Sequence, residues 1–448
     1  MTSAPMDASA GATIHTGVPP GPKYPPLIMT WIFLRHRNKF VRKFHQKYGD
    51  TFSIRILPGP RRLVVFSRPE DIKEIFAGDP SQFHAGEGNS ILKPVMGKHS
   101  VLLTDDAEHM RARKLLMPAF NGASLRGYQS LVESIAKREV DSWTDGQTLV
   151  SLDRMNAVTL EVILQVVFGV TDESRLARMR PLVNRMVNID ARMLLAWSYP
   201  KLFALPPWKS YFVNQQKVDE LLYAEIAERR EATDLDARED VLSRLLKVGR
   251  GEDHDHEALT DPELRDQLVT LLLAGHETTA SALSWTLHEL GRNRDVMREA
   301  LQAADEGNIA FLEACLKESM RMHPVIDFVA RTLKSPQVVG GWSLPRGDTV
   351  APSIMLSHAR EQNFPDAATF RPRRFLEGHV APNTWIPFGG GVRRCIGAGF
   401  SLMEGTSVLR EVLQRYDVVA DEPSPNKLRN ITNVPEDKAP VRLSARHF

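Results

Sequence analysis

Residues 387–399 read PFGGGVRRCIGAG and place one thiol, that of Cys395, among five glycines and two arginines. An amphipathic stretch follows to about Tyr416, which predicts a helix that begins just after the cysteine. Glycines let backbone N–H groups approach the sulfur, the helix N-terminus adds partial positive charge, and Arg393 and Arg394 add full charges. We therefore expect this loop to favour the thiolate, the form of cysteine that binds metals.

Other kinds of site fit this loop poorly. A dinucleotide-binding fingerprint would need a third glycine where the chain has Arg394 or Leu402. A zinc site would need a second cysteine or histidine at ligand spacing, and the sequence near Cys395 has none. A catalytic Cys/His nucleophile stays open from the residues alone, although no local pattern supports it.

The loop resembles that of the cytochrome P450 family, Phe-x-x-Gly-x-Arg-x-Cys-x-Gly. Phe388, Gly391, Arg393, Cys395 and Gly397 fill its defined positions. The resemblance implies a mainly α fold with a small β region, haem b (iron protoporphyrin IX) as cofactor, and Cys395 as the axial ligand of the haem iron. It also implies that Phe388 and Gly397 contact the haem. In this family the thiolate pushes electron density toward iron and favours O–O cleavage.

Residues 260–291 predict a second key element, a helix of about thirty residues. Thr260 and Glu263 form a capping box at its start. Its middle, residues 274–279, reads AGHETT, where a glycine costs about 1 kcal/mol relative to alanine. Gly275 would let a flat cofactor lie against the backbone, and a threonine that bonds back to a carbonyl can open the helix to water. A small-residue patch where helices cross is the alternative.

This segment also matches the family's oxygen-activation motif, Ala/Gly-Gly-x-Asp/Glu-Thr-Thr. The resemblance implies that Ala274 and Gly275 lie beside the haem, that Thr278 hydrogen-bonds dioxygen, and that Glu277 helps to deliver protons. His276 occupies the variable position, so we assign it no catalysis. A His-Glu-x-x-His protease is excluded because residue 280 is alanine.

Two further motifs concern the scaffold. Glu318 and Arg321, on a helix predicted over residues 308–322, match the family's Glu-x-x-Arg pair, and residues 370–375 (FRPRRF) match its Phe-x-Pro-x-Arg-Phe stretch. As a bare pair, Glu318 and Arg321 would be a surface ion pair of little value. The resemblance implies instead a buried network of Glu318, Arg321 and Arg374 that holds the cysteine loop.

Haem also brings two propionates, and guanidinium groups suit carboxylates well. His109 and Arg113 match the family's Trp/His-x-x-x-Arg pattern, while Arg331 and Arg393 occupy the other expected positions. The resemblance therefore implies that these four side chains hold the propionates. A solvated arginine remains the alternative for Arg331.

The remaining sequence indicates one large domain. Residues 1–18 predict a disordered tail, and no linker or repeat divides residues 19–448. The net charge is only +2 and the basic residues are dispersed, so nucleic acid is not an expected partner. The two cysteines, Cys315 and Cys395, lie in different contexts, which argues against a disulfide and favours the cytoplasm.

Local patterns predict several smaller elements. The apolar run Leu27–Leu34 is too short for a bilayer span of about 20 residues, so we expect an opening helix packed on the body, with loose membrane contact as the alternative. Alternation over Thr51–Leu57 and Arg62–Ser67 predicts a β-hairpin. Short strands are expected at Val338–Leu344 and Thr349–Pro352, before an irregular stretch from residue 363 to 387.

The resemblance to members without a membrane anchor or flavin domain implies a cytoplasmic, monomeric monooxygenase. Electrons would come from NAD(P)H through a separate ferredoxin or flavodoxin and its reductase, docking on Arg371, Arg373 and Arg394. We expect an apolar, lipid-like substrate such as a fatty acid, terpenoid or sterol. A peroxide-driven peroxygenase and a haem protein that senses or carries a gas or ligand are the alternatives.

Three apolar segments are candidates for the substrate region. Met193–Tyr199 and Leu202–Trp208 could line an entrance. By the resemblance, Val325–Val329 should lie beside the haem, with Asp327 as its one acidic member.

Overall fold

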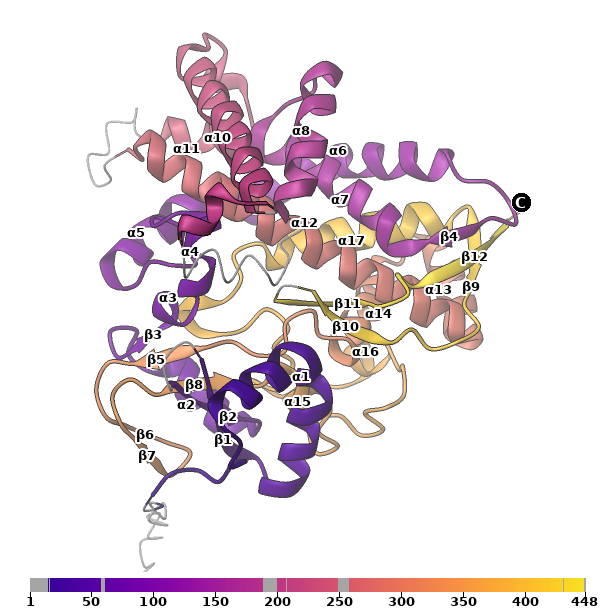
Figure 1. The fold of residues 1–448 in the computed structure, drawn as a ribbon. Helices are drawn as coiled ribbons and strands as arrows, with labels where there is room; N and C mark the ends of the chain where they lie inside the picture. Colours follow the sequence, from indigo (N-terminus) through magenta and orange to yellow (C-terminus); the bar gives the residue numbers. More distant parts are fainter. Residues whose placement is uncertain are drawn as a thin grey trace, which may run out of the picture.

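A long helix, α12 (Asp261–Arg292), occupies the centre of the molecule (Figure 1). The computed structural model describes residues 15, 17–57, 61–187, 200–206, 208–248, 258–429 and 431–446. The predicted capping box is present, because the Thr260 hydroxyl accepts from the Glu263 N–H and the Glu263 carboxylate accepts from the Thr260 N–H. Helices α7, α14 and α17 pack around α12, which explains why it is buried on most sides.

Helices make up most of the described chain. They are α1 (Pro26–Tyr48), α2 (Pro69–Ala77), α3 (Ala85–Gly88), α4 (Lys93–Met96), α5 (Asp106–Leu116), α6 (Gly122–Asp141), α7 (Ser151–Phe168), α8 (Glu173–Val187), α10 (Trp208–Glu231), α11 (Val241–Lys247), α12, α13 (Arg294–Glu306), α14 (Ile309–Met322), α15 (Ile354–His358), α16 (Arg374–Glu377) and α17 (Ala398–Leu413). The predicted helix over residues 308–322 is α14. The mainly α fold expected from the sequence is therefore confirmed.

The strands form small sheets at the edges of this helical body. They are β1 (Thr51–Ile56), β2 (Arg61–Phe66), β3 (Phe83–His84), β4 (Thr148–Val150), β5 (Arg331–Leu333), β6 (Gln337–Val339), β7 (Trp342–Leu344), β8 (Thr349–Pro352), β9 (Tyr416–Val419), β10 (Asn426–Arg429), β11 (Thr432–Pro435) and β12 (Pro440–Ala445). The largest sheet has the order β1-β2-β8-β5-β3, in which β1 and β2 form the predicted hairpin and β2 pairs in parallel with β8. The other sheets are β4-β12-β9, β10-β11 and β6-β7.

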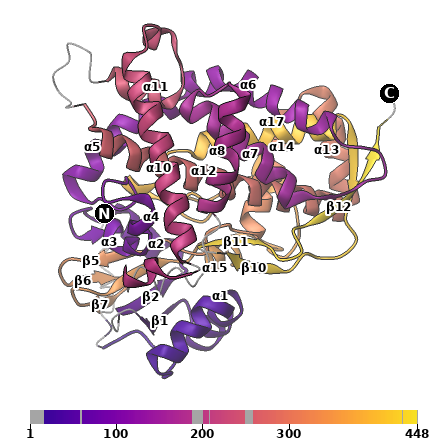
Figure 2. The same ribbon diagram turned by 45° about the horizontal axis from the view of Figure 1, so that its top comes forward.

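Helix α1 lies at one end of the molecule beside β1 and β2, as Figures 1 and 2 show. It packs on the body through Met29, Ile32 and Phe33, so the expected opening helix is present. The helix extends far beyond the apolar run, however, and its backbone kinks at His36.

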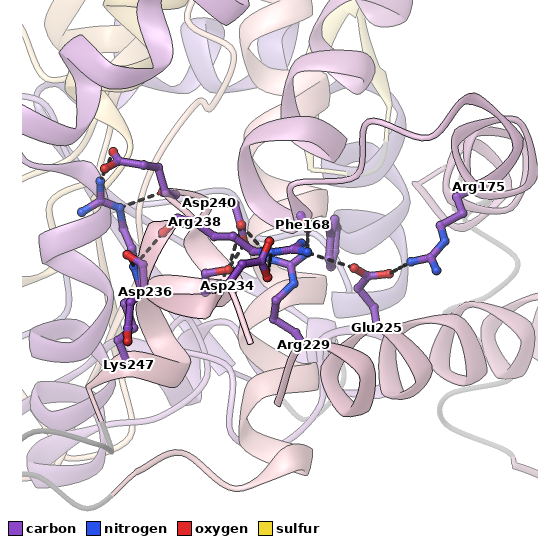
Figure 3. A network of polar contacts seen from close by, with 12 residues as sticks. Phe168, Arg175, Glu225, Arg229, Asp234, Asp236, Arg238, Asp240 and Lys247 are labelled. Carbon is purple, nitrogen blue, oxygen red and sulfur yellow. Dashed lines mark hydrogen bonds and ion pairs between the residues drawn. The ribbon is translucent and has the colours of Figure 1, made fainter. Parts of the chain in front are cut away.

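The guanidinium group of Arg229 joins α7, α10 and α11 in the interior (Figure 3). It donates to Asp240 at 2.7 Å, to Ser243 at 2.6 Å, to the Phe168 carbonyl at 2.6 Å and to Glu225 at 3.0 Å. A buried guanidinium needs partners of this kind for its donors. These contacts hold α10 and α11 firmly against the end of α7.

Among the described residues, no single helix is both long enough and apolar enough to cross a bilayer. Helices α7 and α8 meet the length and composition criteria only as a pair bent by 117°.

Candidate active site

The cysteine loop connects α16 to α17 and packs against α2. A Cβ at Gly390 would lie 2.2 Å from the Phe76 ring, and one at Gly391 would lie 2.2 Å from the Phe76 carbonyl oxygen. Gly391 also has a φ of 64°, which favours glycine. The loop closes with a hydrogen bond from the Cys395 N–H to the Phe388 carbonyl at 2.9 Å. Close packing and turn geometry therefore account for these two glycines.

Burial dominates the environment of the Cys395 thiol. The residue has accessible surface, yet enough protein surrounds it for burial to dominate its pKa. Burial raises the pKa of this thiol, against the opposing effects of the Gly397 N–H, Arg394 and Arg113. The Gly397 N–H and Arg394 therefore favour the thiolate, as expected, but desolvation outweighs them and the net shift of the Cys395 pKa is upward. A bound metal cation would reverse this balance.

One stretch of α12 has accessible surface, although most of the helix is buried. Between Leu264 and Gly291 all its residues are buried except Leu271, Leu273, Ala274, Gly275 and Thr278. The opening therefore coincides with the predicted oxygen-activation motif. The Thr279 hydroxyl lies 3.1 Å from that of Ser401, in the first turn of α17, which places this motif near the helix that follows Cys395.

Within the motif, Thr278 and Gly275 make different contacts. The Thr278 hydroxyl donates to the Ala274 carbonyl at 2.7 Å, the back-bond expected from the sequence. A Cβ at Gly275 would lie 2.8 Å from Cδ1 of Ile163 on α7. The missing side chain of Gly275 therefore lets α7 approach α12, as the helix-crossing alternative predicts, and its contact with a flat cofactor stays a prediction.

Glu277 points away from this opening, toward β10. Its carboxylate lies 3.3 Å from Nε of Arg429. Burial raises the pKa of Glu277, and Arg429 and Thr432 oppose the shift. Glu277 and Arg429 border a cavity of about 250 Å³ that His276 also lines.

His276 is buried beside this cavity without hydrogen-bond geometry at either ring nitrogen. Burial lowers its pKa to about 4, and the Asn156 backbone opposes the shift only in part. One carboxylate oxygen of Glu277 and the Asn156 side-chain oxygen also have no hydrogen-bond partner among the described residues. Several polar atoms thus face one polar cavity, the setting in which ordered water is expected.

A cluster of positive and potentially positive side chains lies near the cysteine loop. Burial lowers the pKa of Arg331 to about 10, with Arg393 adding to the shift. Burial also lowers the pKa of His109 to about 3, and Arg393, Arg113 and Arg331 lower it further. The four side chains expected to hold haem propionates are therefore close enough to act on one another.

The cluster has little negative charge to balance it. Arg393 bonds to Asp105 at 2.5 Å and to the Thr104 carbonyl at 2.6 Å. Neither His109 nor Arg113 makes a side-chain hydrogen bond within the part of the chain that the structure describes. The deficit of negative charge suits two carboxylates, so these residues and the accessible Cys395 fit the haem that the resemblance implies.

Glu318, Arg321 and Arg374 meet in one buried network. Arg321 donates to both oxygens of Glu318 at 2.8 and 2.9 Å, and Arg374 Nε donates to it at 3.0 Å. The Arg371 backbone N–H adds a fourth contact at 3.0 Å. Arg321 also donates to the His358 carbonyl at 3.0 Å. The network therefore joins α14 to the segment that leads into the cysteine loop.

Several functional candidates were missing from the sequence-based prediction. Arg429 and Asp105 contact predicted site residues, and Ser401 contacts Thr279 of the predicted motif, but none of the three carries a recognisable motif of its own. Asp105 does precede a helix, a position that acids favour, and its carboxylate accepts from the Gly86 N–H at 2.9 Å.

The other expected regions have mixed outcomes. Met193–Tyr199 lies outside the described residues, whereas Leu202 and Phe203 belong to a short 3-10 helix. Asp327 is buried and pairs with Arg37 of α1 at 2.6 Å, which explains the acidic residue among Val325–Val329.

The expected docking arginines also differ among themselves. Arg373 pairs with Glu299 at 2.5 Å and with Glu377 at 3.4 Å, so its charge is already matched. Arg371 and Arg394 are exposed.

Comparisons with known proteins identify the family. The cytochrome P450 family model matches residues 19–439. The chain is 52% identical to cytochrome P450 135A1 of Mycobacterium tuberculosis over 96% of both chains. It is 39% identical to cytochrome P450 135B1 of Mycobacterium bovis, over 97% of this chain and 93% of the relative.

Solved structures agree on the fold. Retinoic acid-bound cyanobacterial CYP120A1 superposes with a TM-score of 0.83 at 24% identity, over 96% of this chain and 99% of that one. The haem domain of cytochrome P450DA gives 0.82 at 23% identity, over 97% and 99%. The match of the family model across most of the chain, together with these full-length relatives, shows that the chain belongs to the cytochrome P450 family.

Proposed function

We propose that this cytochrome P450 inserts one oxygen atom from dioxygen into a C–H or C=C bond of a lipid-like substrate, such as a fatty acid, terpenoid or sterol. Members of the family are haem-thiolate monooxygenases, in which bound haem b supplies the oxygen activation. NAD(P)H provides electrons through a redox partner in the general arrangement of the family. For this chain we propose a ferredoxin or flavodoxin with its reductase.

The opening in α12 carries the proposal. A helix buried along nearly its whole length leaves Ala274 and Thr278 accessible, together with the apolar Leu271 and Leu273. An apolar space with one hydroxyl suits a substrate that is held by shape and water exclusion rather than by charge. We propose that Cys395 is the iron ligand and that the haem would bind between it and this stretch of α12.

The cation cluster would hold the cofactor. We propose that His109, Arg113, Arg331 and Arg393 bind the two propionates, with Phe388 and Gly397 beside the sulfur. Planar guanidinium groups can bind carboxylates with two parallel hydrogen bonds. Because the cluster has few carboxylates of its own, the propionates would relieve a repulsion between cations as well as form bonds.

Glu277 and Thr278 would move protons to the reaction. Glu277 borders the polar cavity with Arg429, while Thr278 is on the open face of α12. We propose that water in the cavity supplies protons to Glu277 and that the Thr278 hydroxyl orients the last transfer. Arg429 would hold the Glu277 carboxylate at the polar cavity. Proton delivery through this pair argues for reaction with dioxygen rather than a peroxide-driven reaction.

Ligation is tested by the carbon monoxide absorption spectrum of reduced, haem-loaded protein. The parent protein should show the thiolate-ligated band, and Cys395→Ala should lose it. Cys315→Ala is the matched control, because Cys315 is the other cysteine and is buried in the main core. Retention of the band by Cys395→Ala would refute the proposed ligand.

Substrate class and electron source need a second experiment. Fatty acids, terpenoids and sterols should displace the iron-bound water in spectral titrations and give oxygenated product with NADPH, ferredoxin and reductase. Product with peroxide alone would favour the peroxygenase. Binding of ligand without turnover in either system would favour a sensor or carrier.

A further inference from the structure

Helix α1 presents a row of large apolar side chains to solvent. Leu27, Ile28, Trp31 and Leu34 are 73%, 49%, 58% and 43% exposed. Their spacing places them on one helical face, opposite the side chains that pack on the body. Single exposed apolar residues are ordinary, but four large ones on eight consecutive residues form a patch that calls for a partner.

The same helix is unusually basic. Residues 26–48 contain six Lys and Arg side chains and no Asp or Glu, although the whole chain has a net charge of only +2. Arg37 points inward and pairs with Asp327. The other five, which are Arg35, Lys39, Arg42, Lys43 and Lys47, are exposed and form no ion pair with any residue that the structure describes.

The exposed face belongs to a helix that is held firmly. The Thr30 hydroxyl accepts the Leu57 N–H at 2.9 Å, and Arg37 donates to Asp327 at 2.6 Å. Val41 and Phe44 extend the packing against β1 beyond the kink at His36. The apolar residues are therefore displayed by a fixed element and are not part of a frayed end.

We propose that α1 is an interfacial helix that binds the surface of an anionic lipid bilayer. Leu27, Ile28, Trp31 and Leu34 would enter the boundary between headgroups and acyl chains, with the exposed cations on lipid phosphates. Helices that lie in this boundary combine an apolar face rich in Trp and Leu with Lys and Arg. Each cation near such a surface contributes to binding through the negative surface potential.

The charges on α1 favour an anionic bilayer as the partner over a second copy of the chain. Pairing two α1 helices would cover the apolar face but would bring two sets of unpaired cations together. The position of α1 at one end of the molecule lets a flat surface reach it (Figures 1 and 2). Peripheral contact of this kind needs no spanning helix.

Contact with a bilayer would have a further consequence for the enzyme. Lipid-like substrates partition into membranes, so α1 would keep the enzyme next to their reservoir. This consequence rests on the proposed function, whereas binding to vesicles does not.

Co-sedimentation of the haem-loaded full chain with vesicles tests the proposal. Vesicles of phosphatidylglycerol and phosphatidylcholine in equal parts should bind the protein, and pure phosphatidylcholine should bind it at least tenfold more weakly. Added salt should weaken binding because it screens the cations. The double variant Leu27→Ser/Trp31→Ser should raise the Kd for the anionic vesicles at least tenfold. The double variant Lys39→Glu/Lys43→Glu should have the same effect.

Matched variants separate this surface from general effects. Lys137→Glu with Arg138→Glu reverses two exposed charges on α6, and Leu376→Ser removes an exposed apolar side chain on α16; both should leave the Kd unchanged. Unchanged thermal melting would show that the α1 variants are folded. Failure of the parent to bind anionic vesicles, equal effects of the control variants, or a dimer that Trp31→Ser dissociates would each overturn the proposal. If the parent protein binds vesicles but turns over no soluble lipid-like substrate, the result would count against the proposed function and not against membrane binding.

Discussion

Replacing Glu318 by glutamine should destabilise the protein far more than a similar change at the surface. The Glu318 carboxylate is fully buried and accepts four hydrogen bonds, two from Arg321, one from Arg374 and one from the Arg371 backbone. Glutamine has a similar shape but no charge, so it leaves the buried Arg321 without a counter-ion. Breaking a buried pair in this way costs about 3–5 kcal/mol.

An exposed pair with the same spacing provides the control. Asp295 and Arg298 are also three residues apart on a helix, but their side chains are 91% and 74% exposed. Asp295→Asn should therefore change the unfolding free energy by less than about 0.5 kcal/mol. Urea unfolding at equal haem loading, followed by circular dichroism and by the carbon monoxide band, measures both variants.

A double variant identifies the source of the cost. If the unpaired charge of Arg321 is responsible, Glu318→Gln combined with Arg321→Met should recover part of the lost stability, because apolar replacements of a buried pair are often tolerated. Equal costs for Glu318→Gln and Asp295→Asn would show that burial does not set the strength of this network. The reasoning would then fail.

Three further predictions concern α12. Thr278→Ala should lower product formed per NAD(P)H about a hundredfold while spectral binding of substrate is kept, and Thr279→Ser should not; equal coupling in both variants would exclude the proton role of Thr278. Arg429 lowers the pKa of Glu277 against burial, so Arg429→Met should move the Glu277 limb of the pH–turnover profile to higher pH, whereas the exposed Arg442→Met should leave it in place. If the limb does not move in Arg429→Met, the proposed effect of Arg429 on the pKa of Glu277 would be refuted. Gly275→Ala should lower stability by about 1 kcal/mol through the contact with Ile163, and adding Ile163→Val should be less harmful than the sum of the single changes; strict additivity in urea unfolding would contradict the packing role.

Local signals explain what the sequence could predict. The start of α12 is encoded by Thr260, Pro262 and Glu263, which are adjacent in the chain and interact within one turn. The β1–β2 hairpin likewise depends on alternation in two segments that are neighbours in the sequence. Such elements need no knowledge of the rest of the fold.

Properties that depend on residues far apart in the sequence could not be predicted from it. The positive charge around Cys395 was visible in the sequence, but the desolvation that raises its pKa arises from packing of several segments. Gly275 suggested either a ligand or a helix crossing, and the contact with Ile163 on α7 that supports the crossing could not be found in the sequence. Arg429 could not be connected to Glu277 because β10 follows α12 by more than a hundred residues.

Asp327 shows why the solvent face of α1 can be tested without disturbing the site. Its carboxylate binds Arg37 of α1 and Asn433 of β11, and Asn433 also donates to the Pro324 carbonyl at 2.9 Å. The inner face of α1 thus helps to hold the segment expected beside the haem. A substitution at Arg37 would leave Asp327 buried with an unmatched charge and would alter both membrane contact and catalysis. Trp31, on the outer face, has no such connection, so a change in vesicle binding caused there reports on the surface itself.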